Sequence, residues 1–344
     1  MAPHRMATPE SNDGDVIQYN NISRPLTSGI YAPTPCFFLD NEELDLAAIS
    51  HHAVTLARAG LAGIATQGSN GEAVHLTPAE RILVTKTTRT ALDAAGFSSL
   101  PIIVGCGAQS TRETIALCKD AAIARGDYVL ILPPSYFNFG LRYPLESLIT
   151  FFRDVADASP LPVLIYNFPA AAAGIDLSSD TLLHLAKHPN IVGTKLTDGN
   201  LGRMNRVIAG TSLLLQQQKQ QQQSHPYITL AGSADFLLPS LHLGAEGGLV
   251  GLANILPKTC VALQHAWENG NTKQARFLAG VLSRADEIVQ KGGIVGTKAV
   301  MQEKMGYGGF CRRPLPRLGE GIAELDLRTW MDGIQEGWSV EQSL

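Results

Sequence analysis

The chain has 344 residues, of which 45% are hydrophobic and 17% charged, a balance that is typical of a folded globular protein and excludes a disordered one. Its 27 Lys and Arg residues against 31 Asp and Glu residues give a formal net charge of −4, so there is no basic field to bind nucleic acid. No apolar run is long enough to cross a bilayer, and we expect no membrane partner.

The N-terminal segment, residues 1–24, is predicted to be a disordered extension. It lacks the apolar core that secretory signal peptides carry. Glu10, Asp13 and Asp15 also make it more acidic than a typical mitochondrial presequence, although basic residues near its start leave that alternative open. We therefore expect a cytoplasmic protein, with mitochondria as the alternative location.

The cysteines are odd in number and widely spaced, without a CxxC pair, and no histidine cluster has the spacing of zinc ligands. They are Cys36, Cys106, Cys118, Cys260 and Cys311. This pattern favours free thiols in a reducing compartment over a disulfide framework. We therefore expect no structural metal site.

Short segments that are apolar on both faces alternate with amphipathic segments along most of the chain, as in parallel strands covered by helices. The predicted strands are residues 29–35, 63–68, 101–105, 128–132, 163–167, 191–195, 228–232 and 248–251. Helical patterns between them include residues 44–59, 78–95, 110–125, 145–158 and 178–187. This alternation predicts an α/β fold, a (β/α)8 TIM barrel over residues 25–256 that carries the catalytic site. A doubly wound sheet is the alternative, because a pattern cannot show that the barrel closes.

Two segments depart from this alternation. The glutamine-rich residues 216–223, just before the seventh predicted strand, are expected to form an exposed loop insertion. Residues 257–344 are predicted to be a C-terminal helical region packed on the barrel, with helical patterns at 257–290 and 317–337 and no further strand.

Lys195 ends the sixth predicted strand, and barrel enzymes build their sites at the carboxyl ends of their strands. Burial of its stem among apolar walls would disfavour the ammonium form and leave an amine able to attack a carbonyl. A surface lysine at a strand end is the alternative on position alone.

Tyr166 lies at the end of the preceding predicted strand, so its phenol could meet Lys195 in the barrel mouth and relay protons. A core tyrosine with a satisfied hydroxyl is the alternative.

The turn at residues 68–72, GSNGE, follows the second predicted strand. Its glycines let the backbone approach a ligand, and the hydroxyl of Ser69, the amide of Asn70 and backbone N–H groups suit a carboxylate. Glu72 is expected to satisfy neighbouring loop groups. An ordinary turn would have the same composition.

Several motifs in one order resemble the dihydrodipicolinate synthase/N-acetylneuraminate lyase family of class I aldolases, from about residue 29 to residue 338. They are GSNGE at 68–72, YNFP at 166–169, NIVGTK at 190–195, LAGSAD at 230–235 and GGLVGLAN at 247–254. The resemblance implies that Lys195 forms an imine, that Tyr166 is the acid and base, and that Ser69 joins the proton relay. The substrate-binding set that it implies is Gly68, Ser69, Asn70, Thr197 and Leu249.

Tyr136, in the segment PPSYF, resembles a tyrosine that members of this family insert into the site of a neighbouring subunit. Three aromatic residues at 136–139 in a loop after the fourth predicted strand also favour a subunit contact. We therefore expect a homotetramer, a dimer of dimers in which Tyr136 crosses the tight interface. A loop that folds back over its own barrel mouth as a lid is the alternative.

The substrate class is suggested by a departure from the family pattern. Dihydrodipicolinate synthases have a carboxylate-binding arginine shortly after the YNFP motif, where this chain has alanines at 170–173. A condensing enzyme of that type is therefore the weaker alternative, and the motifs resemble 4-hydroxy-2-oxoglutarate aldolases and L-threo-3-deoxy-hexulosonate aldolases. Both cleave a 4-hydroxy-2-oxo acid to pyruvate and an aldehyde without a cofactor, because the iminium replaces a metal as electrophile.

The sequence disfavours two other kinds of barrel. An inactive ligand-binding barrel is disfavoured because Lys195 and Tyr166 are both present. A phosphate-binding barrel enzyme is disfavoured because the glycine-containing turns at Gly232 and Gly251 have little positive charge nearby.

Overall fold

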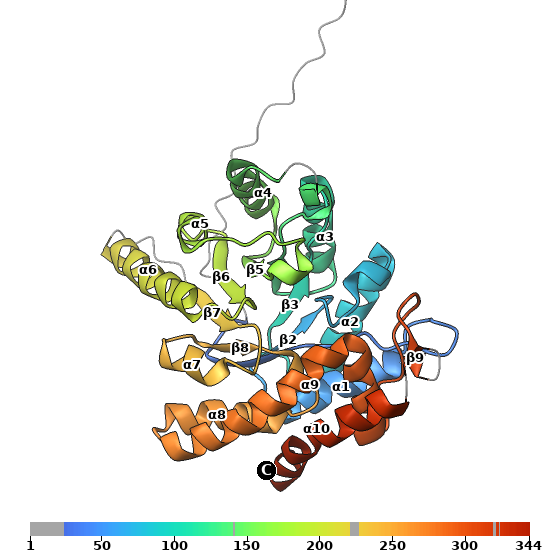
Figure 1. Ribbon diagram of the computed structural model, residues 1–344. Helices are drawn as coiled ribbons and strands as arrows, with labels where there is room; N and C mark the ends of the chain where they lie inside the picture. Colours follow the sequence, from blue (N-terminus) through green and yellow to red (C-terminus); the bar gives the residue numbers. More distant parts are fainter. Residues whose placement is uncertain (1–23, 140–141, 221–226, 319–320, 323) are drawn as a thin grey trace, which may run out of the picture.

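Eight parallel strands form a closed barrel in the order β1-β2-β3-β4-β5-β6-β7-β8, and helices surround it (Figure 1). The computed structural model describes residues 24–139, 142–220, 227–318, 321–322 and 324–344. Pairing of β1 with β8, with Tyr31 opposite Leu249, closes the ring. The prediction of a TIM barrel is confirmed, and the doubly wound alternative is excluded.

The barrel strands are short and buried, and each has a predicted counterpart. They are β1 (Gly29–Pro33), β2 (Gly63–Thr66), β3 (Ile102–Gly105), β4 (Tyr128–Ile131), β5 (Val163–Asn167), β6 (Ile191–Leu196), β7 (Ile228–Ala231) and β8 (Gly247–Leu249). The helices that follow them are α1 (Leu46–Arg58), α2 (Pro78–Ala94), α3 (Thr111–Ile123), α4 (Leu145–Ala158), α5 (Ser179–Leu185), α6 (Leu201–Gln220), α7 (Leu237–His242) and α8 (Pro257–Glu268). Short 3₁₀ turns include η3 (Tyr136–Phe139) and η5 (Gly251–Asn254).

Polar side chains fix where several of these helices begin. The hydroxyl of Thr77 accepts from the backbone N–H of Glu80, whose carboxylate accepts in return from Thr77, so α2 starts with a capping box. Asp45 and Ser110 cap α1 and α3 in the simpler one-sided way. The starts of α1, α2 and α3 therefore follow from local sequence.

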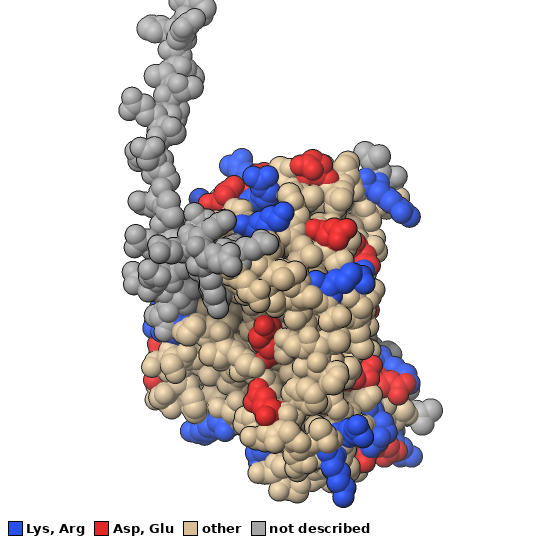
Figure 2. Space-filling model, turned by 90° about the vertical axis from the view of Figure 1, so that its left-hand side faces the viewer, with Lys and Arg blue, Asp and Glu red and all other residues tan. Residues whose placement is uncertain are grey.

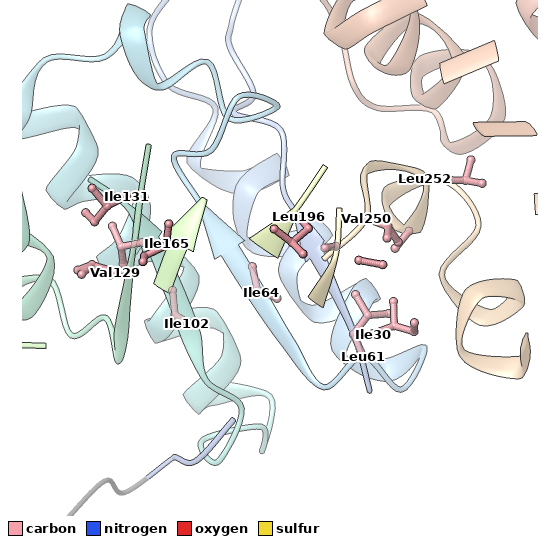
Figure 3. Close-up of a cluster of buried hydrophobic side chains, with 14 of the residues drawn as sticks. Ile30, Leu61, Ile64, Ile102, Val129, Ile131, Ile165, Leu196, Val250 and Leu252 are labelled. Atoms are coloured by element: carbon pink, nitrogen blue, oxygen red, sulfur yellow. The ribbon is translucent and has the colours of Figure 1, made fainter. Parts of the chain in front are cut away.

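Successive strand residues point alternately into the barrel and toward the helices. In β4, Tyr128 and Leu130 belong to the apolar cluster inside the barrel, whereas Val129 and Ile131 belong to the larger cluster outside it. Figure 3 shows part of the outer cluster, in which Ile131, Val129 and Ile165 lie together beside neighbouring strands. Two apolar layers therefore hold the strand ends in fixed positions.

The C-terminal region contains the helices α9 (Thr272–Met305) and α10 (Glu324–Ser343), which pack side by side (Figure 1). The expected helix at 317–337 is corrected: β9 (Arg317–Leu318) pairs with β10 (Gly321–Ile322), and the helix begins only at Glu324. Because α8 packs against β1 and α7, the last barrel helix lies beyond residue 256.

The glutamine tract is the second correction. The expected loop begins instead as helix, because α6 runs from Leu201 to Gln220. Glutamine is a good helix former, so the tract extends the helix. Residues 221–226, and the whole predicted N-terminal extension except Arg24, lie outside the described residues.

Charged side chains of both signs are interspersed on the face in Figure 2, without a broad patch of one sign. Within the described residues, no helix has the length and apolar character to span a membrane. All five cysteines are free and buried.

Candidate active site

A cavity of about 600 Å³ opens at the carboxyl ends of the barrel strands. Five of the predicted site residues line it, namely Ser69, Asn70, Tyr166, Lys195 and Thr197. They come from β2, β5 and β6 or from the residues that directly follow these strands. The structure therefore brings together side chains that are up to 128 positions apart in the chain (69 to 197).

Lys195 and Tyr166 are partners in the register of β5 and β6, so their side chains share one rung of the barrel interior. The Nζ atom of Lys195 lies 4.2 Å from the centre of the Tyr166 ring. Each residue is only 4% exposed, and the Tyr166 ring stacks on Phe168 at 5.7 Å. A buried amine thus lies directly against a phenol at the base of the cavity.

The turn at residues 68–72 is closed by its own backbone. The carbonyl of Gly68 accepts from the N–H groups of Gly71 and Ala73, and the carbonyl of Ser69 accepts from Glu72. Asn70 lies against Gly251, where a Cβ would be 3.0 Å from the Asn70 amide nitrogen. The glycine at 251 therefore leaves room for the Asn70 side chain beside the cavity.

Glu72 holds this turn to the C-terminal region. Its carboxylate forms a buried ion pair with Lys298 of α9 at 2.6 Å, and it also accepts from His75 and from the backbone N–H of Arg312. Glu72 therefore binds neighbouring groups, as the sequence predicted, and does not face the cavity as a catalytic carboxylate. Because Lys298 is bound to this carboxylate and is completely buried, its amine is not available at the cavity.

Thr197 and Asp198 follow β6 and also line the cavity. The hydroxyl of Thr197 packs so closely on Gly232 that a Cβ there would lie 1.8 Å from it. Asp198 pairs with Arg203 at 2.6 Å; burial raises the pKa of this carboxyl, and Arg203 opposes the rise. Sequence reasoning missed Asp198, although its place three residues after Lys195 was a usable signal.

The opposite wall comes from α9 and the β7 loop, which the sequence did not predict. Asp286 accepts from Ser233, from Gln290 and from the backbone N–H of Asp235, and burial raises its pKa. Gly293, at φ 57°, interrupts the helix where α9 passes the cavity. The C-terminal region therefore contributes to the site itself.

Three predicted site residues lie elsewhere. Gly68 and Leu249 are not among the described residues that line the cavity; Leu249 is fully buried in the cluster inside the barrel. Tyr136 is 67% exposed in η3, with Phe137 and Phe139 beside it at 5.2 and 6.0 Å, and it does not reach the cavity of its own chain. Their roles at the site stay predictions.

The comparisons with known proteins agree with this geometry. The model of the dihydrodipicolinate synthetase family matches residues 26–324. A protein of Emericella nidulans named "Probable 4-hydroxy-2-oxoglutarate aldolase, mitochondrial" is 50% identical over 85% of this chain and 90% of its own length. The "L-threo-3-deoxy-hexylosonate aldolase" of Aspergillus niger is 45% identical over 93% of this chain and 98% of its own.

Solved structures give the same assignment. A dihydrodipicolinate synthase family protein from Coccidioides immitis is 31% identical, with a TM-score of 0.79 over 93% of this chain and 99% of that one. A prophage protein of the same family from E. coli K12, solved in complex with pyruvate, is 25% identical, with a TM-score of 0.78 over 91% and 99%. This chain therefore belongs to the dihydrodipicolinate synthetase family, as an aldolase.

Proposed function

We propose that this chain is a Schiff-base aldolase that cleaves a 4-hydroxy-2-oxo acid to pyruvate and an aldehyde. The observation that carries the proposal is the pairing of Lys195 with Tyr166 on one rung, with Nζ 4.2 Å from the ring centre, at the base of the cavity. The names of the aldolase relatives and the pyruvate complex of the E. coli protein support it.

The chemistry begins at the 2-oxo group. The Lys195 amine adds to C2, and loss of water gives an iminium. In that dehydration Tyr166 gives its phenol proton to the departing hydroxyl. The resulting phenolate accepts the proton of the C4 hydroxyl, the C3–C4 bond breaks, and its electrons pass to the iminium as the aldehyde leaves. Protonation of the resulting enamine at C3 and attack of water at C2 release pyruvate and restore the amine.

The substrate carboxylate is assigned to the turn at 68–72. Ser69 and Asn70 border the cavity and offer a hydroxyl and an amide, the donors that a carboxylate accepts. Ser69 is also the candidate for passing the proton onward. Both the 4-hydroxy-2-oxoglutarate aldolases and the L-threo-3-deoxy-hexulosonate aldolases use a substrate of this class, and they differ in the aldehyde half.

The active assembly is proposed to be a homotetramer, a dimer of dimers. The exposed rings of Tyr136, Phe137 and Phe139 support this, because contiguous exposed aromatics are typical of subunit contacts. A lid over the same barrel is less favoured, since none of the three lines the cavity among the described residues.

For the compartment, we keep the cytoplasm as the proposal and mitochondria as the alternative. The name of the Emericella nidulans relative favours the mitochondrial alternative.

Pyruvate release from a panel of 4-hydroxy-2-oxo acids tests the reaction. We expect turnover that EDTA leaves unchanged, because the iminium and not a metal is the electrophile. Lys195→Arg should abolish turnover, since a guanidinium stays protonated and cannot attack a carbonyl. Loss of activity on chelation that zinc or magnesium restores, or an active Lys195→Arg variant, would contradict the mechanism.

A further inference from the structure

The charged side chains around the cavity are mostly acidic. Asp198, Asp235 and Asp286 line it, and Lys195 is the single cationic side chain among its described lining residues. In the proposed reaction the Lys195 amine is bonded to C2 of the substrate, so it cannot pair with a charge elsewhere on the substrate. The part of the cavity that receives the rest of the substrate therefore has carboxyl groups and no free cation within the described chain.

Arg203 of α6 does not change this balance. One of its terminal nitrogens, Nη1, donates to both Asp176 and Asp198, and the other, Nη2, donates to Asp176. A single guanidinium is thus shared between two carboxylates, and Arg203 is not among the residues that line the cavity. The cluster of Asp176, Asp198 and Arg203 therefore has two carboxyl groups and a single guanidinium.

One carboxylate oxygen of Asp198 is available to a ligand. Its side chain is only 7% exposed, and Oδ2 accepts from Arg203. Burial raises the pKa of this carboxyl and the Asn167 side chain and the backbone N–H of Asp198 oppose the rise, but Oδ1 itself is buried without a hydrogen-bond partner in the described structure. The same holds for the hydroxyl of the adjacent Thr197. A buried acceptor without a donor is costly, so these two atoms indicate a ligand that supplies O–H groups.

We propose that the distal end of the substrate is an uncharged polyol, as in a 3-deoxy-2-oxo sugar acid, and that Asp198 Oδ1 accepts a hydrogen bond from a hydroxyl beyond C4. This inference rests on the proposed aldolase reaction and names the substrate class within it. Thr197 can both donate to and accept from the same group of hydroxyls.

A dicarboxylate such as 4-hydroxy-2-oxoglutarate is disfavoured by the same arrangement. Its second carboxylate would leave water to face Asp198, Asp235 or Asp286 without a counter-ion from the described lining residues. An unpaired charge of this kind is an effective means of rejecting a competing substrate. Asp198, Asp235 and Asp286 therefore disfavour a second carboxylate on the substrate by charge, and Asp198 favours a hydroxyl by hydrogen bonding.

The test compares kcat/KM for three substrates by pyruvate release. They are a 3-deoxy-2-oxo hexonate with hydroxyls at C4 to C6, 4-hydroxy-2-oxoglutarate, and 4-hydroxy-2-oxopentanoate, which has no polar group beyond C4. The wild type should prefer the hexonate over the dicarboxylate by about 100-fold or more. A preference for the dicarboxylate would overturn the inference.

Asp198→Ala should lower kcat/KM for the hexonate by about 10- to 100-fold, mainly through KM, which is the usual weight of a hydrogen bond to a charged group. On 4-hydroxy-2-oxopentanoate the same variant should lose at least about threefold less than on the hexonate, because that substrate has no hydroxyl beyond C4 for the carboxyl to bind. Asp198→Asn keeps the shape and an acceptor oxygen, so its kcat/KM for the hexonate should lie between those of the wild type and Asp198→Ala. Equal losses on both substrates would show that Asp198 only supports the fold.

Asp176→Ala is the matched control. It removes the other carboxylate of Arg203 but is not a lining residue of the cavity, so it should not change the ratio of the two rates. A change as large as that of Asp198→Ala would mean that the effect passes through Arg203, against the proposal. Borohydride trapping of pyruvate on Lys195 separates failure of this inference from failure of the proposed aldolase reaction. If an adduct forms but the hexonate is not preferred, only the substrate class is refuted. If no adduct forms, the aldolase reaction itself is refuted.

Discussion

At the scale of single residues, the lysines near the site differ in what holds them. Lys195 Nζ contacts the face of the Tyr166 ring, whereas Lys298 is paired with Glu72 and also donates to the carbonyl of Phe310. Lys298 is completely buried and its amine already donates to two acceptors, so it is not available to a substrate. Lys195 is therefore the amine placed to attack a bound 2-oxo acid.

Tyr166→Phe tests the proton transfer separately from the imine. We expect kcat to fall by about two to four orders of magnitude, because a positioned acid–base group contributes that much. Imine formation with pyruvate should survive better than turnover, since the ring still packs against Lys195 and Phe168. Steady-state rates and borohydride trapping on the same preparations measure both; activity within about threefold of wild type would mean that Tyr166 only packs.

The sequence was sufficient for the reactive pair and insufficient for its surroundings. Lys195 and Tyr166 end neighbouring strands inside a family motif, so position and pattern agree on them. The role inferred for Asp198 depends on Arg203 from the next helix and on one unpartnered oxygen, which only the folded chain reveals. Ion pairs between different helices and strands leave no repeating pattern in the sequence, so they cannot be predicted from it.

At the scale of elements, the C-terminal region is built into the barrel. Lys298 of α9 pairs with Glu72 in the turn after β2. His52 of α1 is hydrogen-bonded on one ring nitrogen to the hydroxyl of Tyr307 and on the other to the amide oxygen of Asn254, each at 3.0 Å. These polar contacts join four segments that are far apart in the chain, and they hold α9 against the barrel.

His52 gives the fold a defined pH dependence. Burial lowers its pKa from 6.5 to about 4, while the unfolded chain titrates near 6.5, so the unfolded state takes up the proton first. The stabilisation is complete above pH 6.5 and is lost as the pH falls toward 4, by about 3 kcal/mol in total. Urea unfolding between pH 7 and pH 4.5 should show this decline.

Two variants isolate the contribution of His52. His52→Gln should flatten the decline in unfolding free energy below pH 6.5, whatever its effect at neutral pH. His51→Gln, at the exposed neighbouring position, should keep the wild-type slope. If His52→Gln and the wild type lose stability in parallel, the buried imidazole is not the source.

Element boundaries followed the local signals where these were strong. The amphipathic segments and the short apolar runs located the barrel helices and strands closely. The C-terminal strand pair and the helical glutamines were missed, because two-residue strands have no periodicity and a polar tract is equally compatible with a loop.

At the scale of the whole molecule, the exposed rings at 136–139 are the main unexplained surface feature. Tyr136, Phe137 and Phe139 are 67%, 62% and 82% exposed, and the ring of Tyr136 contacts the other two. Burial of such rings between subunits would remove this apolar area from water. The proposed tetramer would also bring Tyr136 to the cavity of a neighbouring chain.

Mixed oligomers test that arrangement. Tyr136→Phe and Lys195→Arg subunits, each of low activity alone, should recover activity when coexpressed, because a mixed pair then holds one site with both side chains. Random pairing of equal amounts gives about a quarter of the wild-type sites. Absence of recovery, or a fully active monomer by analytical ultracentrifugation, would refute the shared site.

The central claim is the covalent bond between substrate and Lys195, and borohydride reduction in the presence of pyruvate tests it most directly. The account predicts that peptide mass spectrometry finds a reduced pyruvyl group on Lys195 and that Lys195→Arg protein gives none. An adduct on Lys258 or Lys298 instead, or no adduct from fully folded wild-type protein, would contradict it.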